Sequence, residues 1–328
     1  MTIADNIARA ELEFREFRIP NRRTNLVFEQ IDVLRRVARE AQAEWEAKGN
    51  PRAKRPEQKF LPIIAPSHTG KSTAIHHYAE TVVAKEEHRP RDRPFLHVTL
   101  AQKTSTKRLA SDILEEFGDP SFEKGTEAAL DARIRAYIAG CKTEVIVLDE
   151  IQHVIDSDDS KDPLAGGKAA WSVTEKIKRF LIEGQCPLVL VGTEQAWPIL
   201  FKNPQLTNRC YPPIHMKPLD PADPDDVRLF LEHVSGFDLK LVERGIFPAR
   251  SNLVGGNLPP ALFEISGGMI GQVSRFLEAA TVIALREGAS KIDERHLSEA
   301  VREWAIPLGY VKHDPFASDG PRARRKAA

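Results

Sequence analysis

The segment SHTGKS, residues 67–72, carries residue types that bind phosphate groups. It follows the apolar run FLPIIA, which predicts a strand, and precedes TAIHHYAETVV, which predicts a helix. At such a junction backbone N–H groups and the helix dipole favour an anion. We expect Lys71 to reach the β- and γ-phosphates of a nucleotide and the Ser72 hydroxyl to ligate Mg²⁺. The predicted ATP-binding residues are Ser67, His68, Thr69, Gly70, Lys71, Ser72 and Thr73.

The loop departs from the pattern G-x-x-x-x-G-K-[ST] at its first position. Ala65 stands where glycine is usual, and Pro66 follows it. The N–H groups that hold the phosphates lie nearer Gly70, so the missing glycine need not remove them. Pro66 fixes its own φ and stiffens the entry to the loop. We therefore expect a working loop with an altered rim.

Two consecutive carboxylates end the apolar run in VIVLDEIQHV, residues 145–154. Asp149 is placed to hold Mg²⁺ through water, and Glu150 to orient or deprotonate the attacking water. The alternative is that the two acids simply begin a loop. With a phosphate-binding loop upstream, the pair favours ATP hydrolysis over nucleotide sensing.

Three further residues complete the candidate catalytic set. Thr193 follows the apolar run PLVLVG and can orient the attacking water. Arg209 is poorly placed for its own nucleotide but suits the γ-phosphate of a neighbouring subunit, in trans. Arg275, in SGGMIGQVSRF, lies one turn into a helix that could fold onto the phosphates. Each arginine also has a plainer interpretation, as a surface side chain paired with an acid or facing solvent.

The elements that must position these residues follow from the apolar pattern. Short β-rich runs alternate with amphipathic helical stretches, which predicts an α/β fold with a parallel sheet covered on both sides. After about residue 217 only helical patterns remain. The expected parts are N-terminal helices and a linker (1–58), an α/β nucleotide-binding core (59–216), a helical lid domain (217–305) and a basic flexible tail (306–328).

Composition narrows the classes of partner. The 328 residues contain 47 Lys+Arg and 47 Asp+Glu, so the net charge of the chain does not by itself favour binding to nucleic acid or to a membrane. Apolar runs are far shorter than the roughly 20 residues of a membrane span, and no secretory signal is visible. The three cysteines lack a C-x-x-C pattern. We expect a cytoplasmic protein with reduced thiols and no membrane partner.

The motifs, in this order and with a helical region behind them, resemble an AAA+ ATPase. Four segments resemble the TniB family of transposition ATP-binding proteins, relatives of the TnsC regulators: VLDEIQHVI, LVLVGTEQAWPIL, QLTNRCYPPIHMKPL and GGMIGQVSRFLEAATVIALREGASKIDERHL. The resemblance implies a sheet order of 5-1-4-3-2, Mg²⁺ and ATP at subunit interfaces, and a ring or helical filament on double-stranded DNA. It also implies a DDE-type transposase as partner, and a target-selecting protein as a possible second one.

DNA contacts are expected in AQKTSTKRLA, residues 101–110, near an element that tracks DNA in the family that the chain resembles. Lys103, Thr104 and Lys107 offer the cations and hydroxyl that suit phosphate contacts without sequence readout. A solvated helix start is the alternative for each residue.

The leading hypothesis is an ATP-dependent DNA-binding regulator that directs a transposase and is disassembled by hydrolysis, with ATPase activity stimulated by oligomerisation and DNA. Two alternatives stay open. One is an ATP-switched signalling or scaffold NTPase that does not bind DNA. The other is a replication initiator or helicase loader of the AAA+ class.

Overall fold

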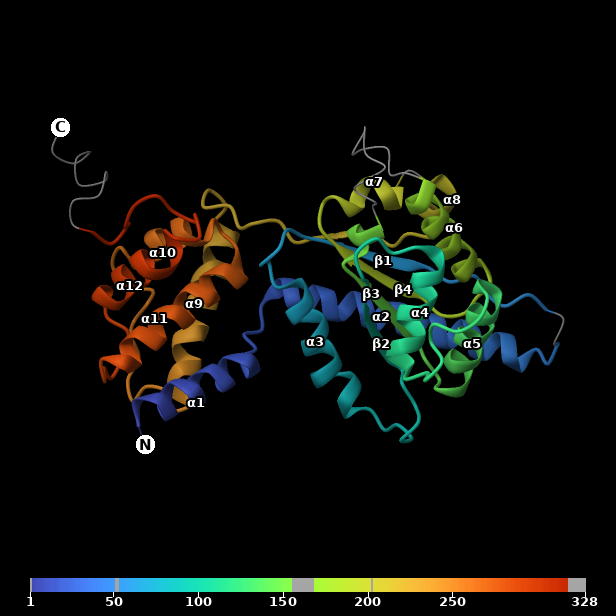
Figure 1. Cartoon of the computed structure of the whole chain (residues 1–328), viewed down its shortest axis with the longest axis horizontal. Helices are drawn as coiled ribbons and strands as arrows, with labels where there is room; N and C mark the ends of the chain where they lie inside the picture. Colours follow the sequence, from blue (N-terminus) through green and yellow to red (C-terminus); the bar gives the residue numbers. More distant parts are fainter. Residues whose placement is uncertain (1, 51–52, 155–167, 202, 318–328) are drawn as a thin grey trace. The chain divides into compact units, whose positions relative to one another are not determined.

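The computed structural model describes residues 2–50, 53–154, 168–201 and 203–317, and the end of the expected basic tail, 318–328, lies outside them. The chain divides into two compact units (Figure 1). The α/β unit contains residues 23–67 and 71–216, and the helical unit contains residues up to 22, 68–70 and those from 217 onward. Each unit is described by itself.

A five-stranded parallel sheet forms the centre of the α/β unit (Figure 1). Its strands are β1 (Phe60–Ile64), β2 (Phe95–Thr99), β3 (Val145–Asp149), β4 (Leu188–Gly192) and β5 (Ile214–His215). Their order is β2-β3-β4-β1-β5. Read from the opposite edge, this is the expected order 5-1-4-3-2, which is therefore confirmed. All five residues of β1, β3 and β4 are buried, as strands covered on both faces must be.

Two helical layers cover the sheet. Strand residues such as Ile63 and Val147 share one apolar cluster with α2 (Arg22–Ala47) and α3 (Lys71–Thr81). Leu148 and Leu188 point to the other face and share a second cluster with three helices: α4 (Thr106–Phe117), α5 (Glu127–Gly140) and α6 (Lys168–Ile182). The shorter elements of the unit are η1 (Val83–Lys85), η2 (Ile151–Val154), α7 (Ala196–Phe201) and α8 (Pro204–Thr207).

A buried arginine joins α2 to the α/β unit. The Arg35 side chain is fully buried, and its Nη2 atom lies 2.7 Å from carboxylate oxygens of both Glu86 and Glu144. Its Nη1 atom donates to the Tyr78 hydroxyl at 2.9 Å. A buried cation is tolerated only with such partners. Arg35 therefore holds α2 at one position on this layer.

The register of the sheet brings functional segments to one edge. Thr99 pairs with Asp149, and Ile64 pairs with Gly192, so β1 to β4 end close to the same level. Parallel strands place the loops that follow them at this edge. The phosphate-binding loop, the acid pair and Thr193 all follow such strand ends.

The helical unit is built around an aromatic and aliphatic core. Phe237 packs against Phe14 and Phe17, with ring centroids 6.2 and 5.4 Å away, so the N-terminal helix belongs to this unit. Its elements are α1 (Ile3–Glu16), α9 (Pro224–Glu243), α10 (Leu258–Ser266), α11 (Ile270–Arg286), α12 (Glu294–Ala300) and the π-helical turn η4 (Val301–Ala305). Within the described residues, no helix combines the length and apolarity that crossing a membrane requires.

Candidate nucleotide-binding site

Ser72 and Asp149 meet where β3 ends and α3 begins. The Ser72 hydroxyl donates to Asp149 Oδ2 at 3.0 Å, and His97 Nε2 lies 3.3 Å from the same oxygen. Burial by itself would raise the pKa of Asp149. The hydrogen bonds from His97, the Glu150 amide and Ser72 outweigh it and hold that pKa below its usual value. The carboxylate is therefore ionised at neutral pH, as a Mg²⁺ ligand must be.

Lys71 is a buried cation, only 6% exposed, at the first position of α3. Among the residues that the structure describes, its ammonium group has no carboxylate partner. Burying a charge without a partner is unfavourable, so this position calls for an anion from outside the chain. Thr193 adds a second unmet group, because its Oγ1 atom is buried and has no hydrogen-bond partner among the described residues.

The phosphate-binding loop has a backbone that explains its unusual sequence. Ala65 is buried and is not among the residues with positive φ, so this position does not require glycine. Positive φ occurs instead at His68 (64°) and Gly70 (90°). A side chain at positive φ is strained, which places the strain of this loop at His68.

The loop tip, His68–Gly70, groups with the helical unit. The Gly271 amide donates to the His68 carbonyl at 2.8 Å. A Cβ atom on Gly271 would lie 2.6 Å from that oxygen, so the close approach requires glycine.

Glu150, the candidate base, is held by a side chain that the sequence analysis did not identify. Gln152 Nε2 donates to the Glu150 carboxylate, and the Thr193 amide donates to Gln152 Oε1 at 3.0 Å. A Cβ on Gly192 would lie 2.7 Å from the same amide oxygen, so glycine leaves room for the bridge. Gln152 thus links the acid pair to the end of β4. The signal in the sequence was a carboxamide two residues after the Asp-Glu pair.

His97 is a second residue that sequence reasoning missed. It lies on β2 beside β3, and its ring packs edge-on against His76 with centroids 4.7 Å apart. This packing orients the ring that contacts Asp149. The available signal was a polar residue inside the apolar run FLHVT.

Few protein side chains at the site are suited to bind magnesium. Within the described ranges, no group of three or more His, Cys, Asp or Glu side chains forms a cluster able to hold a metal ion. A hydroxyl and one carboxylate, Ser72 and Asp149, suit Mg²⁺ because this ion usually keeps several waters and binds through one or two carboxylates and substrate phosphates. The residues present therefore fit Mg²⁺ bound together with a nucleotide.

Arg209 does not join the acid pair of its own chain. Its guanidinium pairs with Glu57 and donates to the Gln205 carbonyl at 2.6 Å. Arg275 lies on α11 of the helical unit, is largely exposed and pairs with Glu278 at 2.9 Å. The catalytic roles of both arginines stay predictions.

The candidate DNA-contacting residues differ in exposure. Lys103, at φ 58°, and Lys107, in the first turn of α4, are exposed. Thr104 is 1% exposed and its hydroxyl donates to the Ala101 carbonyl, so it shapes the loop from inside. Lys103 also lines an open depression at the strand ends, together with Pro66, Gln102, Gln152, His153, Thr193, Glu194 and Gln195.

Solved structures with a similar fold include ORC and Cdc6 proteins. The Cdc6p structure from Pyrobaculum aerophilum is 14% identical, with a TM-score of 0.56 and coverage of 89% of this chain and 70% of that one. The Aeropyrum pernix ORC2 structure with ADPNP and ADP is 16% identical, with a TM-score of 0.54 and coverage of 84% and 67%. The Aeropyrum pernix ORC1 structure in complex with DNA is 17% identical, with a TM-score of 0.53 and coverage of 82% and 64%.

At these identities the likeness is one of fold, and this chain spans about two thirds of each neighbour's length. No curated protein matches the chain in sequence. The fold is that of an AAA+ P-loop ATPase, with a sheet in the expected order and a helical unit. The family model described as Bacterial TniB protein matches residues 38–218, more than half of the sequence, and the chain belongs to the TniB family.

Proposed function

We propose that this chain is an ATP-dependent, DNA-binding regulator of transposition. It assembles on double-stranded target DNA as a ring or helical filament and directs a DDE-type transposase, and hydrolysis disassembles it. The observation that carries the proposal is the buried Lys71, without a carboxylate partner among the described residues, next to the Ser72–Asp149 pair in a TniB-family chain. That combination calls for a nucleotide phosphate at the strand ends.

Each residue of the site has a separate task. Lys71 binds the terminal phosphates, and Ser72 and the ionised Asp149 hold Mg²⁺, directly or through its waters. The metal, when bound, neutralises charge on the phosphate oxygens. His97 keeps the Asp149 carboxylate oriented and ionised.

Glu150 acts on the attacking water. As a carboxylate it accepts a proton or orients the water for in-line attack. Gln152 holds that carboxylate and is itself held by the Thr193 amide, so the positions of Glu150 and Thr193 are coupled. The buried Thr193 hydroxyl is available to orient the water from the other strand.

Assembly and DNA binding use other parts of the chain. Arg209 is proposed to reach the γ-phosphate of a neighbouring subunit, which requires it to exchange Glu57 for the phosphate. Arg275 is proposed to act on the phosphates from the helical unit. Lys103 and Lys107 are proposed to contact DNA phosphates. The Aeropyrum pernix ORC1 neighbour, solved in complex with DNA, supports DNA as the ligand.

The test is a comparison of Glu150→Gln with Lys71→Ala. Glu150→Gln should bind ATP, lose turnover and remain on duplex DNA as a large assembly in sedimentation. Lys71→Ala should not bind ATP or assemble. If Glu150→Gln protein shows no ATP-dependent association with DNA, the regulator proposal fails. A scaffold that does not bind DNA would also lack the steep salt dependence that phosphate contacts produce.

A replication initiator or helicase loader is the second candidate, because the structural neighbours are ORC and Cdc6 proteins. The two candidates differ in what they stimulate. A transposition regulator should raise strand transfer by a purified DDE-type transposase into target DNA when ATP is present, and an initiator should not.

A further inference from the structure

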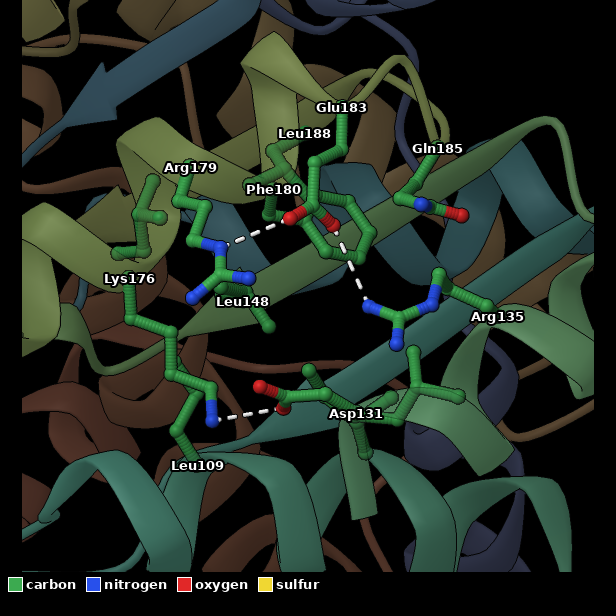
Figure 2. Close-up of a pocket in the computed structure, with 13 residues that line it drawn as sticks. Leu109, Asp131, Arg135, Leu148, Lys176, Arg179, Phe180, Glu183, Gln185 and Leu188 are labelled. Atoms are coloured by element: carbon green, nitrogen blue, oxygen red, sulfur yellow. Dashed lines mark hydrogen bonds and ion pairs between the residues drawn. The ribbon is translucent and has the colours of Figure 1, made fainter. Parts of the chain in front are cut away.

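A cavity opens between α5 and α6 on the sheet face that α4, α5 and α6 cover (Figure 2). We call it the α5–α6 cavity. Its cavity volume is about 40 Å³, and the wider space of about 540 Å³ around it includes the open solvent at its mouth. Leu148 of β3 and Leu188 of β4 lie at its base, and Ile134, Ile177 and Phe180 come from the flanking helices. Its interior is therefore apolar.

Ion pairs at the mouth join the two helices. Lys176 of α6 lies 2.7 Å from Asp131 of α5. Arg135 of α5 lies 3.3 Å from Glu183, and Arg179 lies 2.7 Å from the other oxygen of that carboxylate. Figure 2 shows Arg135 and Arg179 approaching Glu183 from opposite sides. Lys176 is largely buried, but Arg135 and Arg179 are exposed, and ion pairs of exposed arginines exchange partners at little cost, so these two can bind a charged ligand.

A second depression adjoins the cavity and shares Arg135, Arg179, Glu183 and Gln185 with it. We call it the basic ledge. Lys54 and Arg55 extend it beyond the cavity. Taken together, the two depressions are lined by five cationic side chains and two anionic ones, which are Lys54, Arg55, Arg135, Lys176 and Arg179 against Asp131 and Glu183. Glu57 and Glu127 also pair with Lys54 and Lys176, at 2.7 and 2.9 Å, so the surface is apolar inside and carries a small excess of positive charge at its rim.

Two groups on the basic ledge lack an ion-pair or hydrogen-bond partner among the described residues. The Arg55 guanidinium lies over the Trp45 ring, 5.2 Å from its centroid, and has no carboxylate partner in the described part of the chain. Gln185 Oε1 is buried and accepts no hydrogen bond from the part of the chain that the structure describes. A buried acceptor without a donor is unfavourable, so Gln185 calls for an N–H group from a ligand.

We propose that the α5–α6 cavity and the basic ledge form a docking surface for an acidic peptide segment of a partner protein. One apolar side chain of the peptide packs against the apolar mouth of the cavity. Its carboxylates bind Arg55, Arg135 and Arg179, and one of its backbone N–H groups donates to Gln185 Oε1. The surface lies outside the candidate nucleotide site, and the proposal does not depend on the proposed function.

A peptide accounts for both halves of the surface. DNA offers negative charge for the ledge, but its backbone carries no apolar side chain to fill a cavity based on Leu148 and Leu188. Apolar anchors in pockets with a charged rim are characteristic of protein partners. Charge complementarity then requires that the segment be acidic.

The probe is a displayed library of random peptides of about twelve residues, selected on the immobilised full chain. We expect enrichment of sequences that place Asp or Glu beside Leu, Ile or Phe. The best of them, made synthetically with a fluorescent label, should bind the full chain in an anisotropy titration. Replacing its acids by Lys, or its apolar residue by Ser, should each weaken binding about tenfold or more.

Matched variants locate the binding. Arg55→Glu should weaken peptide binding about tenfold; it breaks no ion pair among the described residues and removes the guanidinium from the Trp45 ring. Ile177→Phe should weaken it by filling the cavity. Lys85→Glu is the control, since Lys85 is exposed and η1 packs in the opposite layer. Circular dichroism of each variant checks that it is folded.

Two results would overturn the proposal. One is a selection that enriches no acidic and apolar peptides, or peptides whose affinity is unchanged in Arg55→Glu and Ile177→Phe. The other is a short duplex DNA that binds wild-type protein and loses affinity in Arg55→Glu, while peptide binding does not change. That second result would assign the ledge to nucleic acid.

Discussion

The candidate nucleotide site at the strand ends (the edge) and the α5–α6 cavity on one face of the sheet (the flank) use charged residues in opposite ways. At the edge, Lys71 and the Thr193 hydroxyl are both buried, and within the described residues Lys71 has no carboxylate partner and the hydroxyl has no hydrogen bond. At the flank, Lys176 has two carboxylate partners, Glu127 and Asp131, and stands at the mouth of an apolar cavity. Both places involve β3 and β4, the edge at the ends of these strands and the flank on one face of them.

This difference distinguishes a site with buried unpaired groups from a surface with paired charges. An unmet buried polar group lowers stability unless a ligand completes it, so its presence marks a binding site. Matched ion pairs at a surface contribute little to stability or binding by themselves. Mutations at the edge should therefore change ATP binding and turnover, whereas mutations of the ion pairs at the flank should change stability modestly and leave ATP turnover unchanged.

Lys71→Ala should have the largest effect. Removing the partner of a buried phosphate charge should weaken ATP binding by about 100-fold or more, measured by titration with a fluorescent ATP analogue. The free energy of unfolding without nucleotide should not fall, because the variant no longer buries an unpaired ammonium. Lys107→Ala, an exposed lysine on α4, is the matched control and should leave ATP affinity unchanged. Retained ATP affinity in Lys71→Ala would remove the basis for the proposed nucleotide site.

Gln152→Ala should come second. It removes the link between the Glu150 carboxylate and the Thr193 amide, so the base loses its position. We expect kcat to fall roughly 10- to 100-fold with little change in KM, measured in steady-state ATPase assays.

Gln152→Asn tests whether the length of the side chain matters as well as its amide group, because the shorter side chain cannot hydrogen-bond to both the Glu150 carboxylate and the Thr193 amide in the same way. It should resemble Gln152→Ala in kcat. A variant with normal kcat and raised KM would show that Gln152 serves nucleotide binding instead.

Lys176→Met should change stability only. The substitution keeps much of the apolar stem and removes the ion pairs to Glu127 and Asp131. Lys176 is 13% exposed and its carboxylate partners are 44% and 28% exposed, so we expect a loss of about 1 kcal/mol in the free energy of unfolding, from urea denaturation. ATP turnover should match wild type. A loss of turnover would mean that the flank and the edge are coupled.

Ala65→Gly should have the smallest effect. The residue does not adopt positive φ, so glycine brings no conformational benefit to the folded loop. ATP affinity should change only a few fold, below the tenfold that corresponds to about 1.4 kcal/mol, in the same titration as above. A larger shift would mean that the rim of the loop controls nucleotide binding.

Most of the architecture was predictable because its signals are local. Apolar runs such as EVIVLD, bounded by turns, marked the strands, and their alternation with helices required parallel pairing. The sheet order came from the family resemblance and is confirmed. Lys71, Ser72 and Asp149 were identified because a strand end next to a helix start is visible in one dimension.

Gln152, His97 and the α5–α6 cavity were not predictable in this way. Gln152 matters because the register of β3 and β4 brings its amide to Thr193, and His97 because β2 pairs beside Asp149. Such contacts depend on which strands become neighbours, which no short stretch of sequence encodes.

The sequence by itself determined the strands, the helices and the residues proposed to bind phosphate and metal, because hydrophobic period and junction chemistry are local properties. Tertiary structure alone decided that Lys71 is buried without a carboxylate partner among the described residues, that Glu150 is held by Gln152, and that Arg209 pairs with Glu57. These outcomes follow from packing, which sets which charges lose water and which partners lie within hydrogen-bonding distance.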